Sequence, residues 1–333
     1  MRHAPIIIPT LNRLEHLTRC LRSLERNTGA NETEVYISVD YPPAEKYWNG
    51  YLEVKEWLNE NAKKLKFKAV YVYCQEQNLG PRNNIHFLEN WVREKFDSYI
   101  FTEDDNEFSP NFLEYINKGL DLYEENENVF GICAAKDTEW ISNKKNITCV
   151  KQFPAYGFGS WFSKEDRMKK QGQELLLNTK KMLKPANMWK LFLRNRCLFN
   201  IYICEVLCKE DGLFWQEDNL YWCDSIKSIY MHFSDLLCIV PEVAKSRTWG
   251  NDGSGVNMQA TVINPEEKWP LDKEVNFTYD HIELCYNEGN YKLGSEYLSS
   301  IVTFKGTIKA ILYYLLLLCC QKDRRKAISV LKK

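Results

Sequence analysis

The first 130 residues alternate between short apolar runs and longer segments whose apolar residues recur at helical spacing. The runs are rich in β-branched or aromatic residues and are bounded by polar residues or Pro, which is typical of strands. Strands are predicted over 4–9, 34–39, 68–73 and 98–102. Helices are predicted over 14–24, 47–65 and 82–95. Because strands and helices alternate, this part is predicted to form a doubly wound α/β sheet.

The pattern is less regular after residue 130. Residues 153–161 (FPAYGFGSW) are predicted to form an aromatic, Gly-containing loop, and 164–196 are predicted to be helical with a break at Pro185. A strand is predicted over 238–241, followed by a polar loop. We expect one continuous domain with an α/β half (1–130), a second half (131–265) and a C-terminal extension (266–333).

The C-terminal extension contains eleven unbroken apolar residues, 310–320, followed by a basic segment. A membrane-spanning helix needs about 20 apolar residues, so this run is too short to cross a bilayer. It is predicted to form a helix with one of two roles. The helix packs on the core with basic residues at its C-terminal end, or it lies on an anionic membrane surface.

The composition of the chain limits the kinds of partner that it can bind. With 44 Lys and Arg against 45 Asp and Glu, the chain has no excess positive charge for a nucleic acid. Its 12 cysteines are scattered without a CxxC pair, which favours reduced thiols over a disulfide framework or zinc ribbon. No signal-like apolar segment opens the sequence. We therefore expect a cytoplasmic protein without a nucleic-acid partner.

Polar side chains follow three of the predicted strands. Arg13 follows the first, Asp40 the second and the acidic run 103–105 the fourth. Parallel sheets bind ligands beyond the carboxyl ends of their strands, so these residues are candidates for one site. Carboxylates packed together repel each other unless they share a cation, and oxygen ligands suit Mg²⁺ or Mn²⁺. The alternative is that the acidic run is a solvated turn.

Six segments, in this order, resemble motifs of glycosyltransferases with the GT-A fold. The resemblance is to N-acetylglucosaminyltransferase I and its relatives and, more broadly, to the family-two glycosyltransferases. The segments are IIIPTLNRLEHLTRCLRSL, ISVD, TEDDNEFSPNFLEY, FPAYGFGSWFSKED, YWCD and PEVAKSRTWGNDGSG. The resemblance implies a Rossmann-like, mixed and mainly parallel sheet flanked by helices, here with a C-terminal helical tail.

The resemblance also implies roles for individual residues. Asn12, Arg13 and Asp40 would bind the nucleotide, and Glu103 and Asp104 the sugar and ribose. Asp105 would hold Mn²⁺ or Mg²⁺ on the diphosphate. Asp224 would be the general base, and the loop over 246–255, with Arg247, would close on the donor. The aromatic residues Tyr156, Phe158 and Trp161 would bind the acceptor.

The chemistry of the predicted base can also be considered from the residues themselves. Tyr221 and Trp222 flank Asp224 and would partly desolvate it, which raises the basicity of a carboxylate. Glu217 and Asp218 are the alternative bases. Asp224 could equally cap the helix predicted to follow it.

Arg247 likewise has two readings. It could bind a phosphate group, or it could form a structural ion pair with Glu242.

We therefore expect a metal-dependent, inverting glycosyltransferase. It would move a sugar from a nucleotide-sugar donor, a UDP-linked one such as UDP-GlcNAc, to a hydroxyl of a glycan or lipid-linked acceptor. Polysaccharide biosynthesis at the inner face of a membrane, with peripheral contact through the C-terminal tail, is the expected setting. The alternatives are a nucleotidyltransferase and a non-catalytic carbohydrate-binding protein on the same fold.

Overall fold

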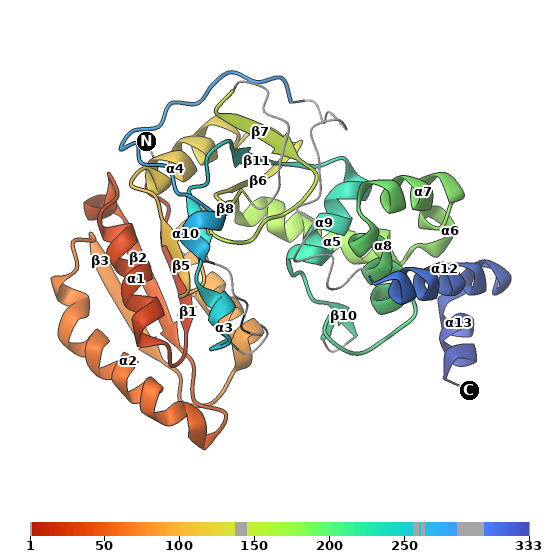
Figure 1. Cartoon of the computed structure of the whole chain (residues 1–333), viewed down its shortest axis with the longest axis horizontal. Helices are drawn as coiled ribbons and strands as arrows, with labels where there is room; N and C mark the ends of the chain where they lie inside the picture. Colours follow the sequence, from red (N-terminus) through yellow and green to blue (C-terminus); the bar gives the residue numbers. More distant parts are fainter. Residues whose placement is uncertain are drawn as a thin grey trace.

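A computed structural model describes residues 2–136, 145–216, 218–255, 260, 264–284 and 303–332. It contains an eight-stranded sheet with the order β3-β2-β1-β4-β8-β6-β11-β7 (Figure 1). The strands are β1 (Ile6–Thr10), β2 (Glu34–Val39), β3 (Ala69–Cys74), β4 (Ser98–Phe101), β6 (Val129–Cys133), β7 (Ile147–Val150), β8 (Phe158–Trp161) and β11 (Leu237–Pro241). β8 and β7 are antiparallel to their neighbours, and the other strands run in one direction.

Helices cover both faces of the sheet because its strands are apolar on both sides. In β1, Ile6 and Ile8 pack with the core on one face, which also includes residues of α1 (Leu14–Glu25), α2 (Trp48–Asn61) and α4 (Phe112–Leu122). Ile7 points to the opposite face, where residues of α3 (Gly80–Arg93), α5 (Phe162–Leu177) and α9 (Asp224–Ser234) pack. The predicted fold class, a mixed and mainly parallel sheet flanked by helices, is confirmed.

The second half of the chain completes the sheet and adds a helical layer. The predicted loop 153–161 is wrong for its last four residues, which form β8 between β4 and β6. Gly159 allows this, because a Cβ there would lie only 2.5 Å from the Ile116 side chain of α4. Pro185 begins a helix, as its fixed φ favours, so the predicted helical segment divides there.

The helical layer lies beyond β8 and β6 at the far end of the molecule from α1 and α2 (Figure 1). It contains α6 (Thr179–Met182), α7 (Pro185–Arg194), α8 (Arg196–Asn200), a π-helix (Ile201–Leu207), α12 (Phe304–Cys319) and α13 (Arg324–Leu331). Buried residues of α12 and α13 belong to the same core as those of α5 and α9. No helix in the described ranges is both long and apolar enough to span a membrane.

Candidate functional site

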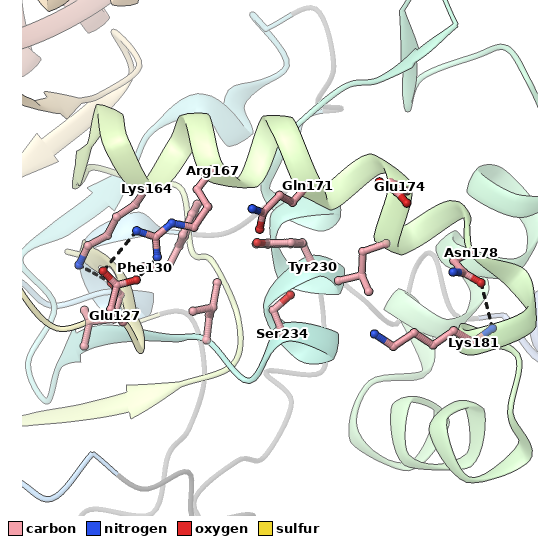
Figure 2. A pocket seen from close by; sticks show the side chains of 13 residues that line it. Glu127, Phe130, Lys164, Arg167, Gln171, Glu174, Asn178, Lys181, Tyr230 and Ser234 are labelled. Carbon is pink, nitrogen blue, oxygen red and sulfur yellow. Dashed lines mark hydrogen bonds and ion pairs between the residues drawn. The ribbon is translucent and has the colours of Figure 1, made fainter.

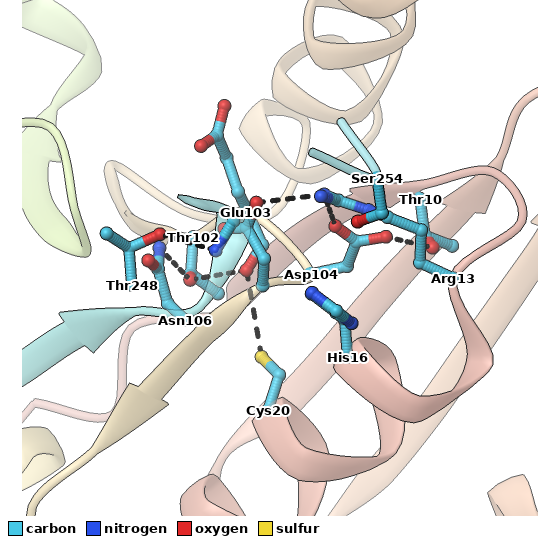
Figure 3. Close-up of polar contacts among 12 residues, drawn as sticks. Thr10, Arg13, His16, Cys20, Thr102, Glu103, Asp104, Asn106, Thr248 and Ser254 are labelled. Carbon is cyan, nitrogen blue, oxygen red and sulfur yellow. Dashed lines mark hydrogen bonds and ion pairs between the residues drawn. The ribbon is translucent and has the colours of Figure 1, made fainter. Parts of the chain in front are cut away.

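The acidic run lies at the carboxyl edge of the sheet, directly after β4 (Figure 3). Asp104 and Asp105 are buried, with 3% and 8% of their surface exposed, whereas Glu103 is exposed. The Thr10 hydroxyl, at the end of β1, donates to Asp104 Oδ2 at 2.7 Å. Since β1 and β4 are parallel neighbours, their ends bring these residues together, as the sequence predicts.

Arg13 joins the two buried aspartates. Its guanidinium donates to Asp104 Oδ1 and lies 3.0 Å from Asp105 Oδ2. Burial alone would lower the pKa of Arg13, but the charges of Asp104 and Asp105 raise it above its usual value, so the group stays charged. The predicted nucleotide-binding Arg13 is therefore held by acidic side chains of the same site.

Asp105 is incompletely compensated. Its Oδ1 is buried and has no hydrogen-bond partner. Burial raises the pKa of Asp105 and the charge of Asp104 raises it further, whereas Arg13 lowers it. An orphaned, buried carboxylate oxygen fits a cation ligand. The described residues nevertheless contain no group of three or more His, Cys, Asp and Glu side chains arranged to hold a metal.

A second segment covers the acidic run. β11 ends at the same edge of the sheet as β4, and the chain then forms β12 (Ser246–Thr248), which pairs antiparallel with β5 (Asn106–Phe108). This pairing places the Trp249 N–H 2.8 Å from the Asp105 carbonyl oxygen. Gly250 packs directly against the Asp105 carboxylate. The part of loop 246–255 that follows β12 therefore lies over Asp105.

His16 connects this loop to α1. Its Nε2 lies 3.2 Å from Asp252 Oδ2, and Figure 3 shows the ring beneath Asp104 on the same side as Cys20. The charge of His16 lowers the pKa of Asp105. The sequence contains a signal for the place of His16: it is three residues after Arg13, which directly precedes α1, so the two side chains lie on the same side of the helix start.

Asp224 approaches the same site from the second half of the chain. It is the first residue of α9, and Cys223 precedes the helix. The Asp224 residue is exposed. Desolvation and the charges of Asp105 and Asp104 raise the pKa of Glu103 to about 8, and the charge of Asp224 adds a smaller contribution. Desolvation by the surrounding protein raises the pKa of Asp224 itself. Hydrogen bonds from Ser225, including one from its N–H at 2.7 Å, lower that pKa.

Tyr221 lies between these two carboxylates and α3. Burial raises its pKa to about 12, and the charges of Glu103 and Asp224 add to the effect. The Arg82 guanidinium lies 4.1 Å from the Tyr221 ring centre and donates to the Trp215 carbonyl oxygen at 3.0 Å. Arg82 thus ties the segment before Asp224 to the start of α3, and the sequence analysis did not identify it.

Asp40 has a structural role in addition to any role in binding a ligand. It is buried, and its Oδ1 accepts hydrogen bonds from the N–H groups of Tyr41 and Leu79 at 2.9 and 2.8 Å. Burial raises the pKa of Asp40, and these hydrogen bonds lower it. Asn12, which follows β1, packs its carbonyl oxygen tightly against Gly50 of α2. Asp40 therefore fixes the turn that begins α3.

Arg247 forms an ion pair, but not the one considered from the sequence. Its Nε donates to Glu107 Oε2 at 2.9 Å, because Arg247 and Glu107 are partners in the β12–β5 ladder. It also contacts Glu266 at 3.1 Å. Glu242 pairs with Lys136 instead. The predicted Arg247–Glu242 pair is wrong because register, not sequence distance, determines the partner.

Two of the three predicted acceptor-binding aromatics lie in the core. Phe158 and Trp161 belong to β8 and are 5% and 2% exposed, so neither ring offers a free face to a sugar. Their assignment as acceptor-binding residues is wrong, since the segment became a central strand. Tyr156, just before β8, is partly exposed, and its carbonyl oxygen accepts a hydrogen bond from Ser246.

One of the alternative bases, Asp218, lies in a hairpin. β9 (Trp215–Gln216) and β10 (Asn219–Leu220) pair antiparallel, and Asp218 is exposed in their turn with a φ of 65°. Glu217 lies outside the described residues.

The molecule also has a cavity away from these acids. Figure 2 shows side chains of α5 and α9, among them Arg167, Gln171 and Tyr230, around a cavity of about 430 Å³. Of the residues that the structure describes, the cavity lining includes none of the predicted site residues. Its charged groups are partly paired, as between Arg167 and Glu127. The acidic site therefore lies apart from this cavity.

No protein-family model and no curated protein sequence matches this chain. Solved structures of glycosyltransferases share part of its architecture. TarS of S. aureus is 12% identical over 74% of this chain and 36% of that one, with a TM-score of 0.38. A shorter form, TarS 1–349 with UDP-GlcNAc, is 16% identical over 47% of this chain and 45% of that one, with a TM-score of 0.32.

A third similar structure is the mannosyltransferase PcManGT from Pyrobaculum calidifontis in complex with GDP-Man and Mn²⁺. It is 12% identical over 69% of each chain, with a TM-score of 0.37. The match to the first TarS structure covers only about a third of the length of that chain.

Proposed function

We propose that this protein is an inverting glycosyltransferase that uses a nucleotide-sugar donor, a UDP-linked sugar such as UDP-GlcNAc, and transfers the sugar to a hydroxyl of a glycan or lipid-linked acceptor. One observation carries the proposal. The two halves of the chain bring carboxylates to one edge of the sheet, with Asp104 and Asp105 buried and Asp224 exposed near Glu103. A buried acidic pair beside an exposed acid suits chemistry that needs a cation and a separate base.

The buried part of the site would hold the donor. Asp105 would ligate Mn²⁺ or Mg²⁺ through its orphaned Oδ1, and the ion would neutralise charge on the leaving diphosphate. Arg13 would exchange part of its contact with Asp104 and Asp105 for a phosphate oxygen. Asp40 would bind the uracil of the nucleotide through Oδ2, which accepts a hydrogen bond from the Asn78 amide at 3.2 Å and can accept another.

The exposed part of the site would carry out the transfer. Asp224 would remove the proton from the acceptor hydroxyl while the hydroxyl oxygen attacks the anomeric carbon of the donor sugar. The bond from that carbon to the diphosphate oxygen would break, and the nucleoside diphosphate would leave from the opposite face, which inverts the configuration. Glu103 would orient the sugar, and Tyr156 is the remaining candidate for the acceptor side.

The raised pKa of Asp224 supports its role as base. A carboxylate with a raised pKa accepts a proton more readily than a fully solvated one. The hydrogen bonds from Ser225 hold the carboxylate at the start of α9.

The proposal is tested by measuring UDP release from UDP-GlcNAc with Mn²⁺, with and without glycan acceptors. Asp224→Asn should lower kcat by about 10²- to 10⁴-fold, because the base is removed while shape is kept. Asp218→Asn is the matched control. Asn tolerates the positive φ at this turn, so this variant should retain full turnover.

Wild-type turnover in Asp224→Asn would show that the base is elsewhere, and equal losses in the two variants would show that the effect is not specific to Asp224. A panel that includes GDP-linked sugars identifies the donor. Release of pyrophosphate from UTP and a sugar phosphate, in place of UDP release from UDP-sugars, would support the nucleotidyltransferase alternative. Sugar binding without any turnover would support the non-catalytic one.

A further inference from the structure

We propose that α12 is a docking surface for an anionic lipid bilayer. Its outward side carries a continuous apolar stripe, which we define as Phe304, Ile308, Ile311, Leu312 and Leu315. These side chains are 82%, 41%, 39%, 58% and 48% exposed. They recur every three or four residues along one side of a 16-residue helix, so they form one face.

The opposite side of α12 is fixed to the protein. Ala310 and Leu317 are fully buried, and Cys320, just after the helix, is 5% exposed. The Tyr314 hydroxyl reaches the Leu183 carbonyl oxygen at 3.4 Å, and Thr179 Oγ1 donates to the Lys322 carbonyl oxygen at 2.5 Å. The helix thus packs on the core, as one of the two sequence readings predicts, and its orientation holds the apolar stripe outward.

The charges of the segment that carries the stripe, residues 303–332, are almost all positive. Lys305 and Lys309 lie within α12, which contains no acidic residue. Over 303–332 the chain has seven Lys and Arg and one Asp. Of these residues, Arg324 forms an ion pair with Glu210, with 3.4 Å between Nη1 and Oε1. An apolar face beside cationic side chains is the arrangement that binds an anionic membrane surface, where the apolar face enters the headgroup boundary.

An exposed apolar face of this kind could also be covered by a second copy of this chain, but the charges beside the stripe favour a lipid bilayer. Two stripes packed together would bring the lysines of both copies close to each other, and like charges in contact oppose association. Anionic lipid headgroups compensate the same lysines. A second exposed apolar pair in the helical layer, Trp189 and Leu193 of α7, is 61% and 64% exposed. Trp is favoured at membrane interfaces.

The proposal does not depend on the glycosyltransferase assignment, because vesicle binding is measured without nucleotide. The full chain is floated with vesicles of phosphatidylcholine alone or with added phosphatidylglycerol. We expect binding only to the anionic vesicles. Lys305→Gln with Lys309→Gln should weaken binding about 30-fold, since each cation contributes about fivefold. Leu312→Ser with Leu315→Ser should weaken it about tenfold or more.

Leu122→Ser is the matched control. Leu122 of α4 is 58% exposed, as Leu312 is, but it lies on the sheet half of the molecule, so this variant should bind vesicles as the wild type does. Unfolding temperatures show whether each variant is folded. Failure of the folded wild type to bind anionic vesicles would overturn the proposal. So would a self-association in solution that the stripe variants abolish, because a second copy would then be the occupant.

Discussion

Gly250 gives the most specific test of how the site is assembled. A Cβ atom at this position would overlap Asp105 Oδ2 and would lie 3.0 Å from Asp105 Cγ. Carbon atoms in ordinary contact are about 3.5–4.0 Å apart, so Gly250→Ala requires a displacement of about 1 Å. The loop cannot easily take up this displacement, because the neighbouring Trp249 N–H is bonded to the Asp105 carbonyl oxygen at 2.8 Å.

The Asp105 carboxylate must therefore move, away from its contact with Arg13 at 3.0 Å. A misplacement of about 1 Å costs about 10²-fold in rate, which corresponds to about 2.7 kcal/mol in the activation barrier. Gly255→Ala is the matched control in the same loop. The nearest atom to its Cβ, Arg13 Nη1, would lie at an ordinary 3.5 Å.

The assay is UDP release from UDP-GlcNAc at saturating Mn²⁺, together with the unfolding temperature of each variant. We expect Gly250→Ala to lose about 10²-fold in kcat/KM while remaining folded, and Gly255→Ala to keep its activity. A folded Gly250→Ala variant with wild-type turnover would refute the claim that the loop and Asp105 form one site. Equal losses in both variants would point to a general effect on the loop.

Two further predictions concern the support of α9. Lys227 and Glu165 form a buried ion pair of 2.7 Å. Lys227→Met leaves the Glu165 charge unpaired, so it should lower the free energy of unfolding, measured with urea, by about 3–5 kcal/mol. Adding Glu165→Leu to Lys227→Met should recover most of that loss. Burial lowers the pKa of His232 to about 3, so between pH 6.5 and 3 the unfolded chain binds the extra proton and stability falls as pH falls. Urea unfolding should show a loss of about 2 kcal/mol between pH 7 and 5 that His232→Gln removes, and an unchanged pH slope in that variant would contradict the assignment.

The part of the site that was predicted from the sequence depends on local patterns. Each strand of the first half is a short apolar run, and the residues that follow it must lie at the sheet edge. Thus Arg13 and the acids after β4 meet as expected. Asp224 is likewise near its expected place, because a polar residue before a strong helical pattern begins that helix.

The rest depends on long-range register. β8 was missed because its place between β4 and β6 is fixed by packing against α4, which a short Gly-containing segment does not reveal. The partner of Arg247 follows from the β12–β5 ladder, and His16 meets Asp252 only because that ladder returns the chain to α1. Phe158 and Trp161 were misassigned for the same reason, since aromatic side chains suit both a core strand and a sugar site.

The measurement that tests the central claim most directly is the thermal unfolding of the wild type and Asp105→Ala with UDP, with and without Mn²⁺. A ligand that binds only the folded state stabilises it, by about 2.7 kcal/mol at 100 times its Kd. We predict that UDP raises the unfolding temperature of the wild type only with Mn²⁺, and that Asp105→Ala loses this shift. Absence of any shift with UDP or other nucleoside diphosphates, in a folded wild type with Mn²⁺, would contradict the assignment of a nucleotide-sugar site.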